Sequence, residues 1–275
     1  MQKVSFPFAY MILPWFLLLH ATFSSTFPSP PRPRCHEDEK SALLEFKATY
    51  FTKVPSLFYC LDQSVKLESW KAESGDQPDV DCCAWDGVEC DEVSGHVIAL
   101  DLSCGFLSGP LDSNTSIFRL HHLQSLNLAF NRFNSSHIPL ELGNLGFMTN
   151  LNLSHNNFEG QVPPSLSNLT QLTHLDLSWN LLSGPIPSQF QNLTQLTHLD
   201  MGKNWLNGTI PYYLGNFSKM KYLDIWVNKL GGEIPPSLRH LALLEHLNLG
   251  FNQFLTSEIP SFFKKSDPTY IFRSM

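Results

Sequence analysis

Leucines alternate with polar residues in short segments that return along most of the chain. In the segment 172–180, LTHLDLSWN, Leu175 and Leu177 alternate with polar positions, as expected of a short strand with one buried face. The nine residues NLTQLTHLD occupy positions 168–176 and recur unchanged at 192–200, 24 positions later. A fixed period of this size predicts a solenoid, in which each repeat buries its leucines only by stacking on its neighbours.

A single asparagine follows each leucine-rich segment and sets the register of the repeats. These asparagines are spaced by 25, 24, 24, 24 and 24 residues and are Asn131, Asn156, Asn180, Asn204, Asn228 and Asn252. The segment 97–111 fits the same frame with Gly105 in place of the asparagine, which predicts seven repeats over residues 97–260. A side-chain amide at such a turn can bond backbone groups of its own and the neighbouring coil, so we interpret this column as structural.

The second half of each repeat carries turn residues. Four repeats place a glycine before an Ile-Pro or Val-Pro pair, in FEGQVP, LSGPIP, LNGTIP and LGGEIP. The glycine permits a tight backbone, and the proline ends pairing beyond a short second strand. The segments that follow, such as SLSNL, suit a helical turn on the convex side. Two repeats, NRFNSSHIP and NQFLTSEIP, lack the glycine and carry one extra residue before Ile138 and Ile259.

The residues before the repeats divide into three predicted parts. Lys3 precedes a 14-residue apolar stretch at 6–19, and small residues follow, which predicts a secretory signal peptide over residues 1–25. This stretch is shorter than the ~20 residues that span a membrane. Prolines in FPSPPRPR predict an extended linker over residues 26–34. Residues 35–96 then combine an amphipathic helical pattern at 36–51 with a cysteine-rich segment, and we expect them to cap the solenoid.

Two sets of motifs resemble known protein families. The LxGxIP form of the repeats resembles the plant-type leucine-rich repeat. The segments CHEDEKSALLEFK, ESWK, DCCAWDGVEC, SGHVIALDLSC and HHLQSLNLAFNRFNSSHIP resemble the amino-terminal region of plant receptor-like proteins, which are cell-surface receptors without a kinase. The resemblance implies an α/β solenoid with a curved parallel sheet, a helical or irregular convex side and a disulfide-bonded N-terminal cap.

The same resemblance implies a function. It indicates an extracellular, ligand-binding domain of a receptor in defence or developmental signalling. The implied partners are a peptide, protein or glycan ligand and a co-receptor kinase. Two alternatives stay open: a secreted inhibitor of a microbial wall-degrading enzyme, similar to polygalacturonase inhibitors, and a non-functional receptor fragment.

The six cysteines are expected to form disulfides, because an exported chain favours oxidation. In similar caps the first cysteine joins the first of the adjacent doublet, which implies the bridges Cys35–Cys82 and Cys83–Cys90. Cys60 and Cys104 remain, and their pairing stays open. A zinc site built from these cysteines with His36 is the alternative, but no CxxC spacing supports it.

Charge and motifs argue against several function classes. A net charge of −7 argues against nucleic acid and anionic membrane as partners. The sequence contains no GxSxG, HExxH or phosphate-loop motif, so we predict neither an enzyme nor a cofactor. N-glycosylation motifs that we expect on loops or the convex side are Asn114, Asn134, Asn168, Asn192, Asn207 and Asn216. A seventh, Asn152, lies between two strand leucines and is the weakest candidate.

The concave face of the sheet is the candidate binding surface. Its outward positions include Asp101, Asn127, Asn152, Asp176, Asp200, Asp224 and Asn248. Because exposed aromatic groups anchor many interfaces, we predict a ligand site made of Phe130, Trp179, Tyr222, Trp226 and Phe251 with Asp176, Asp200 and Asp224. Trp179 and Trp226 lie two repeats apart, so we expect them roughly 10 Å apart across the sheet.

Three histidines share one strand position, namely His174, His198 and His246. At ~4.8 Å between neighbouring strands, His174 and His198 are expected to be adjacent. A metal-binding or proton-sensitive patch is one interpretation. We favour the other, that the histidines only repeat a common THLDL segment.

After Pro260 the sequence continues as SFFKKSDPTYIFRSM, without a cysteine-bonded cap or an apolar span. We therefore expect residues 261–275 to be the tail of a truncated receptor-like protein. In the last repeat, Leu244, Leu247 and Leu249 are expected to face an open end. Apolar tail residues would shield this end only in part, and these are Phe262, Phe263, Tyr270, Ile271 and Phe272.

Overall fold

The computed structural model describes residues 33–52, 60, 66–71, 80–255 and 270–271. The chain divides into two compact units, Met1–Pro31 and Arg32–Met275. The first unit, with the predicted signal peptide, lies outside the described residues, and so does most of the predicted tail. The second unit contains the cap and the repeats.

The cap begins with the predicted helix, α1 (Glu37–Tyr50). Three acidic residues occupy its first turn, where negative charge favours the helix N-terminus. Its inner face buries Ala42, Leu43 and Phe46, each of which is fully shielded from solvent. Two short 3₁₀ turns follow, η2 (Lys66–Ser69) and η3 (Cys82–Ala84), and then strand β1 (Val88–Cys90).

Disulfides and a tryptophan pair hold the rest of the cap together. All six cysteines are paired, as Cys35–Cys82, Cys60–Cys104 and Cys83–Cys90. The first and third are the bridges that the resemblance implied, and the second joins the cap to the first repeat. The Trp70 and Trp85 rings stack at 5.5 Å, and Trp70 Nε1 donates a hydrogen bond to the Asp86 carbonyl at 3.0 Å. Two large buried aromatic groups therefore form the centre of the cap.

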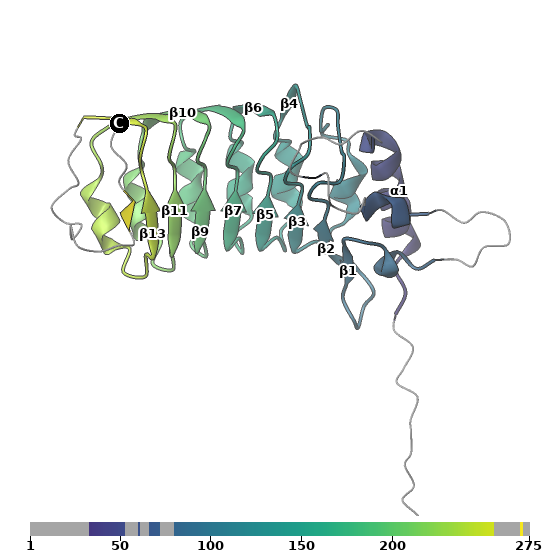
Figure 1. Cartoon of the computed structure of the whole chain (residues 1–275). Coiled ribbons are helices and arrows are strands. Elements are labelled where there is room, and N and C mark those ends of the chain that lie inside the picture. The colour runs from purple at the N-terminus through teal and green to yellow at the C-terminus, as the bar shows by residue number, and fades with distance from the viewer. Residues whose placement is uncertain (1–32, 53–59, 61–65, 72–79, 256–269, 272–275) are drawn as a thin grey trace, which may run out of the picture. The chain divides into compact units, whose positions relative to one another are not determined.

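The leucine segments form one curved sheet, as predicted. Figure 1 shows its strands side by side along the solenoid. The nine strands are ordered β1-β2-β3-β5-β7-β9-β11-β13-β15, parallel except for the β1–β2 pair. Beyond β1, their bounds are β2 (Val97–Asp101), β3 (Ser125–Asn127), β5 (Asn150–Asn152), β7 (His174–Asp176), β9 (His198–Asp200), β11 (Tyr222–Asp224), β13 (His246–Asn248) and β15 (Tyr270–Ile271). Equivalent residues of neighbouring repeats are paired, for example His174 with His198.

The glycine-proline half of each repeat forms a second parallel row along one edge of the solenoid (Figure 1). Its strands are β4 (Ser136–His137), β6 (Phe158–Gln161), β8 (Leu181–Gly184), β10 (Trp205–Thr209), β12 (Lys229–Gly232) and β14 (Gln253–Phe254). The predicted role of glycine is confirmed, because Gly160, Gly184, Gly208 and Gly232 have φ angles of 73° to 82°.

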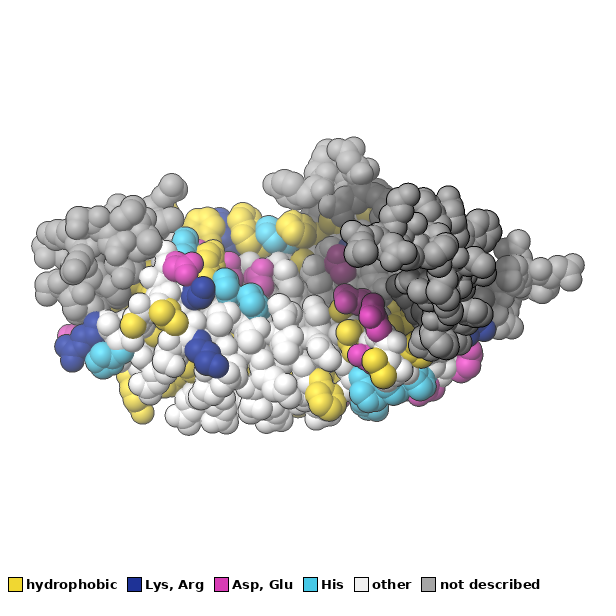
Figure 2. Space-filling view, turned by 90° about the horizontal axis from the view of Figure 1, so that it is seen from below, with side chains coloured by type: hydrophobic (Ala, Val, Ile, Leu, Met, Phe, Trp, Pro, Cys, Tyr) yellow, Lys and Arg dark blue, Asp and Glu magenta, His cyan; other side chains and the backbone are white. Residues whose placement is uncertain are grey.

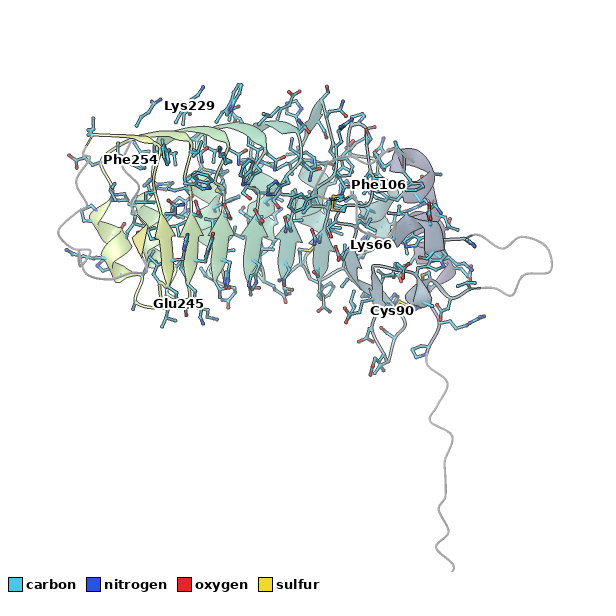
Figure 3. The ribbon with its side chains drawn as sticks, in the orientation of Figure 1. Lys66, Cys90, Phe106, Lys229, Glu245 and Phe254 are labelled. Carbon is cyan, nitrogen blue, oxygen red and sulfur yellow. A yellow bond between two sulfur atoms is a disulfide. The ribbon has the colours of Figure 1, made fainter. Side chains whose placement is uncertain are left out.

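The convex side is made of short 3₁₀ turns, most of which begin directly after a proline. These turns are η4 (Ser116–Arg119), η5 (Leu140–Asn144), η6 (Pro164–Asn168), η7 (Ser188–Asn192), η8 (Tyr212–Asn216) and η9 (Pro236–His240). Figure 3 shows that the two edges of the sheet differ, since Lys229 lies at the edge with the second row and Glu245 at the opposite edge.

The asparagine column is buried and fully engaged, as predicted. Asn204 Nδ2 donates to the carbonyls of Leu177, Met201 and Gly202, and Asn204 Oδ1 accepts from the Leu182 amide at 3.0 Å. Asn156 is the exception. It follows the repeat with the extra residue, and its Oδ1 has no hydrogen-bond partner among the residues that the structure describes.

The end of the last repeat differs from the expectation. Strand β15 pairs in parallel with β13, Leu247 opposite Tyr270, so the edge of β13 has a backbone partner. Leu244, Leu247 and Leu249 are at most 9% exposed. The expected open end was wrong for these three leucines, because the prediction gave residues 270–271 no strand.

Candidate ligand-binding face

The concave face carries its side chains in columns, because strands of equal register are stacked. The first residues of the strands form the ring column, made of Ser125, Asn150, His174, His198, Tyr222 and His246. The third residues form the carboxylate column, made of Asp101, Asn127, Asn152, Asp176, Asp200, Asp224 and Asn248. Leucines between the two point into the core and are buried.

Four rings of the ring column lie nearly parallel. The His174 and His198 centroids are 4.2 Å apart, those of His198 and Tyr222 6.0 Å, and those of Tyr222 and His246 4.2 Å. The predicted adjacency of His174 and His198 is confirmed. Burial lowers the pKa of both histidines; the neighbouring His198 lowers that of His174 further, and Lys221 lowers that of His198. Both imidazoles are therefore neutral at pH 7.

The tautomer of these two histidines follows from the threonine beside each. The Thr173 hydroxyl donates to the Thr149 carbonyl at 2.9 Å and lies 2.8 Å from His174 Nδ1. A hydroxyl has one proton to give, so His174 Nδ1 must be the donor to it. Thr197 and His198 repeat the arrangement, with distances of 3.0 and 2.8 Å. Nδ1 thus carries the proton in both neutral rings, and Nε2 is left as a hydrogen-bond acceptor.

The carboxylate column has a structural role in every coil. In each coil, one side-chain oxygen accepts from the amide two residues later, for example Asp176 Oδ1 from Ser178 at 2.9 Å and Asp200 Oδ1 from Gly202 at 2.9 Å. The second polar atom of the side chain is an oxygen in the aspartates and an amide nitrogen in the asparagines. Asp224 Oδ2 is held by Asn248 Nδ2 at 2.9 Å.

Asp101 and Asp200 show opposite pKa shifts within this one column. Burial, together with the charges of Asp176 and Asp224 and against a hydrogen bond from Gly202, raises the pKa of Asp200 to about 8. At Asp101 burial acts in the same direction, but bonds from Lys66 and Ser103 outweigh it and hold the pKa below its usual range. Lys66 Nζ lies 2.6 Å from Asp101 Oδ2, at the cap end of the face (Figure 3).

A groove of about 450 Å³ lies over the ring and carboxylate columns. Its lining residues span strands β3 to β11 and are Ser125, Leu126, Asn127, Asn150, Leu151, Asn152, His174, Leu175, Asp176, His198, Asp200 and Tyr222. None of these described lining residues is a lysine or an arginine. The groove is therefore rich in acceptors and negative in charge.

A row of ring side chains and one lysine, called the aromatic ridge, lies on the coils just after the carboxylate column. It consists of Phe130, His155, Trp179, Lys203, Trp226 and Phe251. Successive ring centroids are 4.1 Å apart for Phe130–His155, 4.9 Å for His155–Trp179, 6.4 Å for Trp179–Trp226 and 6.3 Å for Trp226–Phe251. Trp179 and Phe251 remain 45% and 47% exposed.

The ridge differs from the sequence expectation in one distance. Trp179 and Trp226 were expected roughly 10 Å apart, but their rings are in edge-to-face contact at 6.4 Å. The Trp226 indole extends back over the preceding coil, where Gly202 has no side chain and a methyl group would overlap the ring. Lys203 Nζ lies 4.9 Å from the Trp179 ring and 5.1 Å from the Trp226 ring, within cation–π range of both.

The structure thus distributes the eight predicted ligand residues over three parallel rows. Phe130, Trp179, Trp226 and Phe251 lie on the ridge, Tyr222 in the ring column, and the three aspartates in the carboxylate column. Sequence reasoning missed His155 and Lys203, although His155 is 24 residues before Trp179 and Lys203 is 24 after it. It also missed Gly202 and the two threonines, because their roles depend on contacts between coils.

The predicted glycosylation sites lie away from this face. All six predicted asparagines are exposed, and three of them, Asn168, Asn192 and Asn216, end equivalent turns of the convex side. The doubtful Asn152 is half-buried in the carboxylate column, where its Oδ1 accepts from the Ser154 amide at 2.9 Å. Among the described residues, no helix is long and apolar enough to cross a bilayer.

Comparisons with known proteins agree with this architecture. A leucine-rich-repeat N-terminal domain matches residues 36–91, and leucine-rich repeats match residues 122–145, 147–206, 219–241 and 243–266. Receptor-like protein 6 of Arabidopsis thaliana is 42% identical over 149 residues, which cover 52% of this chain and 14% of that protein. The chain therefore spans only a small part of this relative's length.

Two solved receptor structures are similar as well. The structure of PEPR1 with AtPEP1 matches with a TM-score of 0.66 and 29% identity, over 80% of this chain and 29% of the other. The Arabidopsis receptor kinase HAESA, in complex with the peptide hormone IDA and the co-receptor SERK1, matches with a TM-score of 0.60 and 31% identity, over 82% and 39%. With its matching cap, repeats and relatives, the chain belongs to the leucine-rich-repeat family and is similar to plant receptor-like proteins.

Proposed function

We propose that this chain is the extracellular recognition domain of a plant cell-surface receptor-like protein, and that its concave face binds a peptide segment with a basic side chain. The observation that carries the proposal is the acceptor-rich groove. Asp176 and Asp200 line it on neighbouring strands, Asp224 follows on the next strand, and two neutral histidines beside them offer Nε2 as an acceptor. Arginine suits such a site best, because its guanidinium presents five donors.

A basic group of the ligand would offset the repulsion between the neighbouring carboxylates. Asp200 has a pKa of about 8 because Asp176 and Asp224 flank it and burial removes water. A guanidinium between these carboxylates would favour the charged form and release the proton of Asp200. Affinity should therefore rise with pH up to about 8, since at lower pH binding must first remove that proton.

The aromatic ridge supplies the apolar part of the proposed interface. Exposed tryptophan and phenylalanine bury a large area at low cost in side-chain entropy. Lys203, held between Trp179 and Trp226, adds the one positive charge of the ridge, and a carboxylate of the ligand would pair with it. A peptide that crosses both rows would place a basic residue in the groove and an apolar or acidic residue on the ridge.

The comparisons support a peptide as the ligand class. One similar structure is a complex with AtPEP1, and another contains a peptide hormone together with a co-receptor. By analogy we include a co-receptor kinase as a second partner, which would bind the domain only with its ligand present. A position in the secretory pathway or at the cell surface belongs to the same proposal.

The test is a selection of peptides from a random display library with the secreted chain. Selected sequences should be enriched in arginine and should bind at least 10-fold more weakly to an Asp176→Asn, Asp200→Asn, Asp224→Asn variant. Both proteins carry Ser178→Ala, because Asp176→Asn would otherwise create an N-x-S glycosylation motif. Asparagine occupies the same column at positions 127, 152 and 248, so this variant keeps the backbone bonds. Asp112→Asn, an exposed acid outside the columns, is the control. Selection without basic residues, or equal affinity of the triple variant, would contradict the proposal.

A further inference from the structure

A second cluster of ring side chains lies at the other end of the sheet edge, between the cap and the first repeats. The rings of His36 and His96 stack at 3.9 Å, those of His96 and His122 at 3.7 Å, and Phe147 follows His122 at 6.1 Å. Figure 2 shows histidine side chains gathered with acidic ones toward the end of the molecule that carries α1. This cluster contains a buried carboxylate.

That carboxylate belongs to Glu39 of α1, and its side chain is 4% exposed. Oε2 accepts from the Val97 amide at 2.9 Å, which fixes the orientation of the group. Oε1 lies 3.2 Å from His96 Nδ1 and 4.0 Å from His122 Nδ1. The three ligand atoms all lie within 4.8 Å of one another. One carboxylate oxygen and two imidazole nitrogens thus lie close together in a single cluster.

We propose that Glu39, His96 and His122 bind a divalent transition-metal ion, with Zn²⁺ the best match. Two histidines and one carboxylate are a donor set of zinc sites that keep a fourth position open for water. Ligand atoms around a tetrahedral zinc ion at ~2.0–2.1 Å are about 3.3 Å apart. The Glu39–His96 distance of 3.2 Å already fits, and the Glu39–His122 distance must shorten by less than an ångström.

His122 is the residue that must move. Parallel rings cannot both direct an Nδ1 lone pair at one ion, so metal binding has to rotate His122 out of its stack with His96. Its side chain is 47% exposed, and solvent leaves room for that rotation. Glu39 and His96 are held in place by the Val97 amide and by the His36 ring. Two of the three ligands, Glu39 and His96, are therefore already in position, and only His122 has to move to complete the site.

Other metal ligands in the described part of the chain are weaker candidates. Two further groups of potential ligands contain the cysteines Cys35, Cys82, Cys83 and Cys90, but all of these are in disulfides and provide no thiolate. His174 and His198 give their Nδ1 protons to threonines, and no carboxylate joins them in a cluster of this size. A metal ion should accordingly prefer the site at Glu39.

The consequence of binding is a bridge between three segments far apart in sequence. Glu39 lies on α1, His96 directly before β2, and His122 in the loop before β3. A metal ion would tie the cap helix to the first and second coils, which adds a cross-link between cap and repeats to the one that the Cys60–Cys104 bridge provides. We therefore assign it a structural role at the cap, independent of ligand binding on the concave face.

The experiment is a titration of the purified, disulfide-bonded chain with ZnCl₂, followed by calorimetry and by the thermal midpoint with and without EDTA. The wild-type chain should bind one ion tightly, and zinc should raise its midpoint. His122→Ala should weaken binding at least 30-fold, because it removes an exposed ligand without touching the core. Glu39→Gln should weaken it as well, since the amide oxygen still accepts from Val97 but carries no charge. Hydrogen exchange at the amide of Val97 should slow with zinc.

The matched control is His121→Ala, the exposed histidine next to His122 in sequence. It should bind zinc as the wild type does. If His122→Ala and His121→Ala bind zinc equally, or if zinc leaves the wild-type midpoint unchanged, the site does not exist. Binding that persists in His122→Ala but disappears in His198→Ala would place the metal on the concave face and overturn the proposal in the same way.

Discussion

The cap and the repeats reach stability by different means. In the repeats, most coils use the same parts: buried leucines, an asparagine bonded to two coils, and a proline before the turn. In the cap each part occurs once, as in the Trp70–Trp85 stack and the Cys35–Cys82 bridge, whose cysteines are 47 residues apart. The difference teaches that a lost contact in a coil weakens one of many equivalent layers, whereas a lost contact in the cap removes a unique support.

The largest expected effect is on the cap. Removing the Cys35–Cys82 bridge by changing both residues to alanine should lower the free energy of unfolding of the cap by about 4 kcal/mol, because the bridge closes a long loop. Removing Cys83–Cys90, whose cysteines are 7 residues apart, should cost about 2 kcal/mol. Guanidinium unfolding measures both values. Hydrogen exchange should show that Leu175 stays protected while α1 opens; simultaneous loss of both regions would contradict the distinction.

The next effect is within the repeats. Asn204→Ala removes three donor bonds and leaves the Leu182 amide without an acceptor, which should cost about 3 kcal/mol. Asn156→Ala provides the matched control. Asn156 makes the donor bonds, but its Oδ1 bonds nothing in the described structure, so its loss should cost about 1 kcal/mol less. Equal losses in a denaturant titration would show that the acceptor bond adds nothing.

The next prediction is a substitution that raises stability. Stacking of the coils brings Asp176, Asp200 and Asp224 together, and their like charges repel one another. The folded-state pKa of Asp200 is about 8, above its value in the unfolded chain, so the folded state binds more protons between about pH 4 and pH 8. Stability of the wild type should therefore fall as the pH rises through this range. Asp200→Asn should remove that slope and raise the free energy of unfolding at pH 8 by on the order of 1–3 kcal/mol.

Denaturant titrations of Asp200→Asn and the wild type at pH 4, 6 and 8 measure this difference. The two proteins should have similar stability near pH 4, and Asp200→Asn should become increasingly more stable than the wild type as the pH rises to 8. Asp101→Asn is the contrasting control: its pKa is held low by Lys66, so the substitution should lower stability at neutral pH. A wild-type stability that rises from pH 4 to pH 8 together with that of Asp200→Asn would contradict the raised pKa.

The smallest effect on stability concerns the ridge. Gly202→Ala should displace the Trp226 indole from Trp179 and cost at most about 1 kcal/mol, because the ring can move toward solvent. Its tryptophan fluorescence and near-ultraviolet circular dichroism should change. Gly146→Ala, where an added methyl group meets nothing within 4 Å, should leave both spectra as they are. Unchanged spectra in Gly202→Ala would mean that the tryptophans are not coupled.

The regular part of the fold was predictable from the sequence. The alternation at Leu175 and Leu177 placed the strands, and the asparagine spacing set the register. Contacts between coils were harder, because side-chain direction matters as much as spacing: Trp226 reaches back over Gly202, and the Trp179–Trp226 distance was overestimated for that reason. The Glu39 cluster was invisible, since its members are 57 and 26 residues apart in sequence and outside the repeat pattern.

In each coil, the residue directly before the asparagine of the asparagine column, or before Gly105 in the first coil, has a left-handed backbone although it is not glycine. These residues are Cys104, Phe130, His155, Trp179, Lys203, Val227 and Phe251, with φ angles of 50° to 58°. Each coil accepts the same backbone cost of about 1 kcal/mol or more whatever side chain stands there. Disulfide, aromatic, imidazole, amine and aliphatic groups all occur. The coil conformation therefore does not depend on the side chain at this position. Substitutions there can change the chemistry of the surface one residue at a time while the backbone of the coil stays the same.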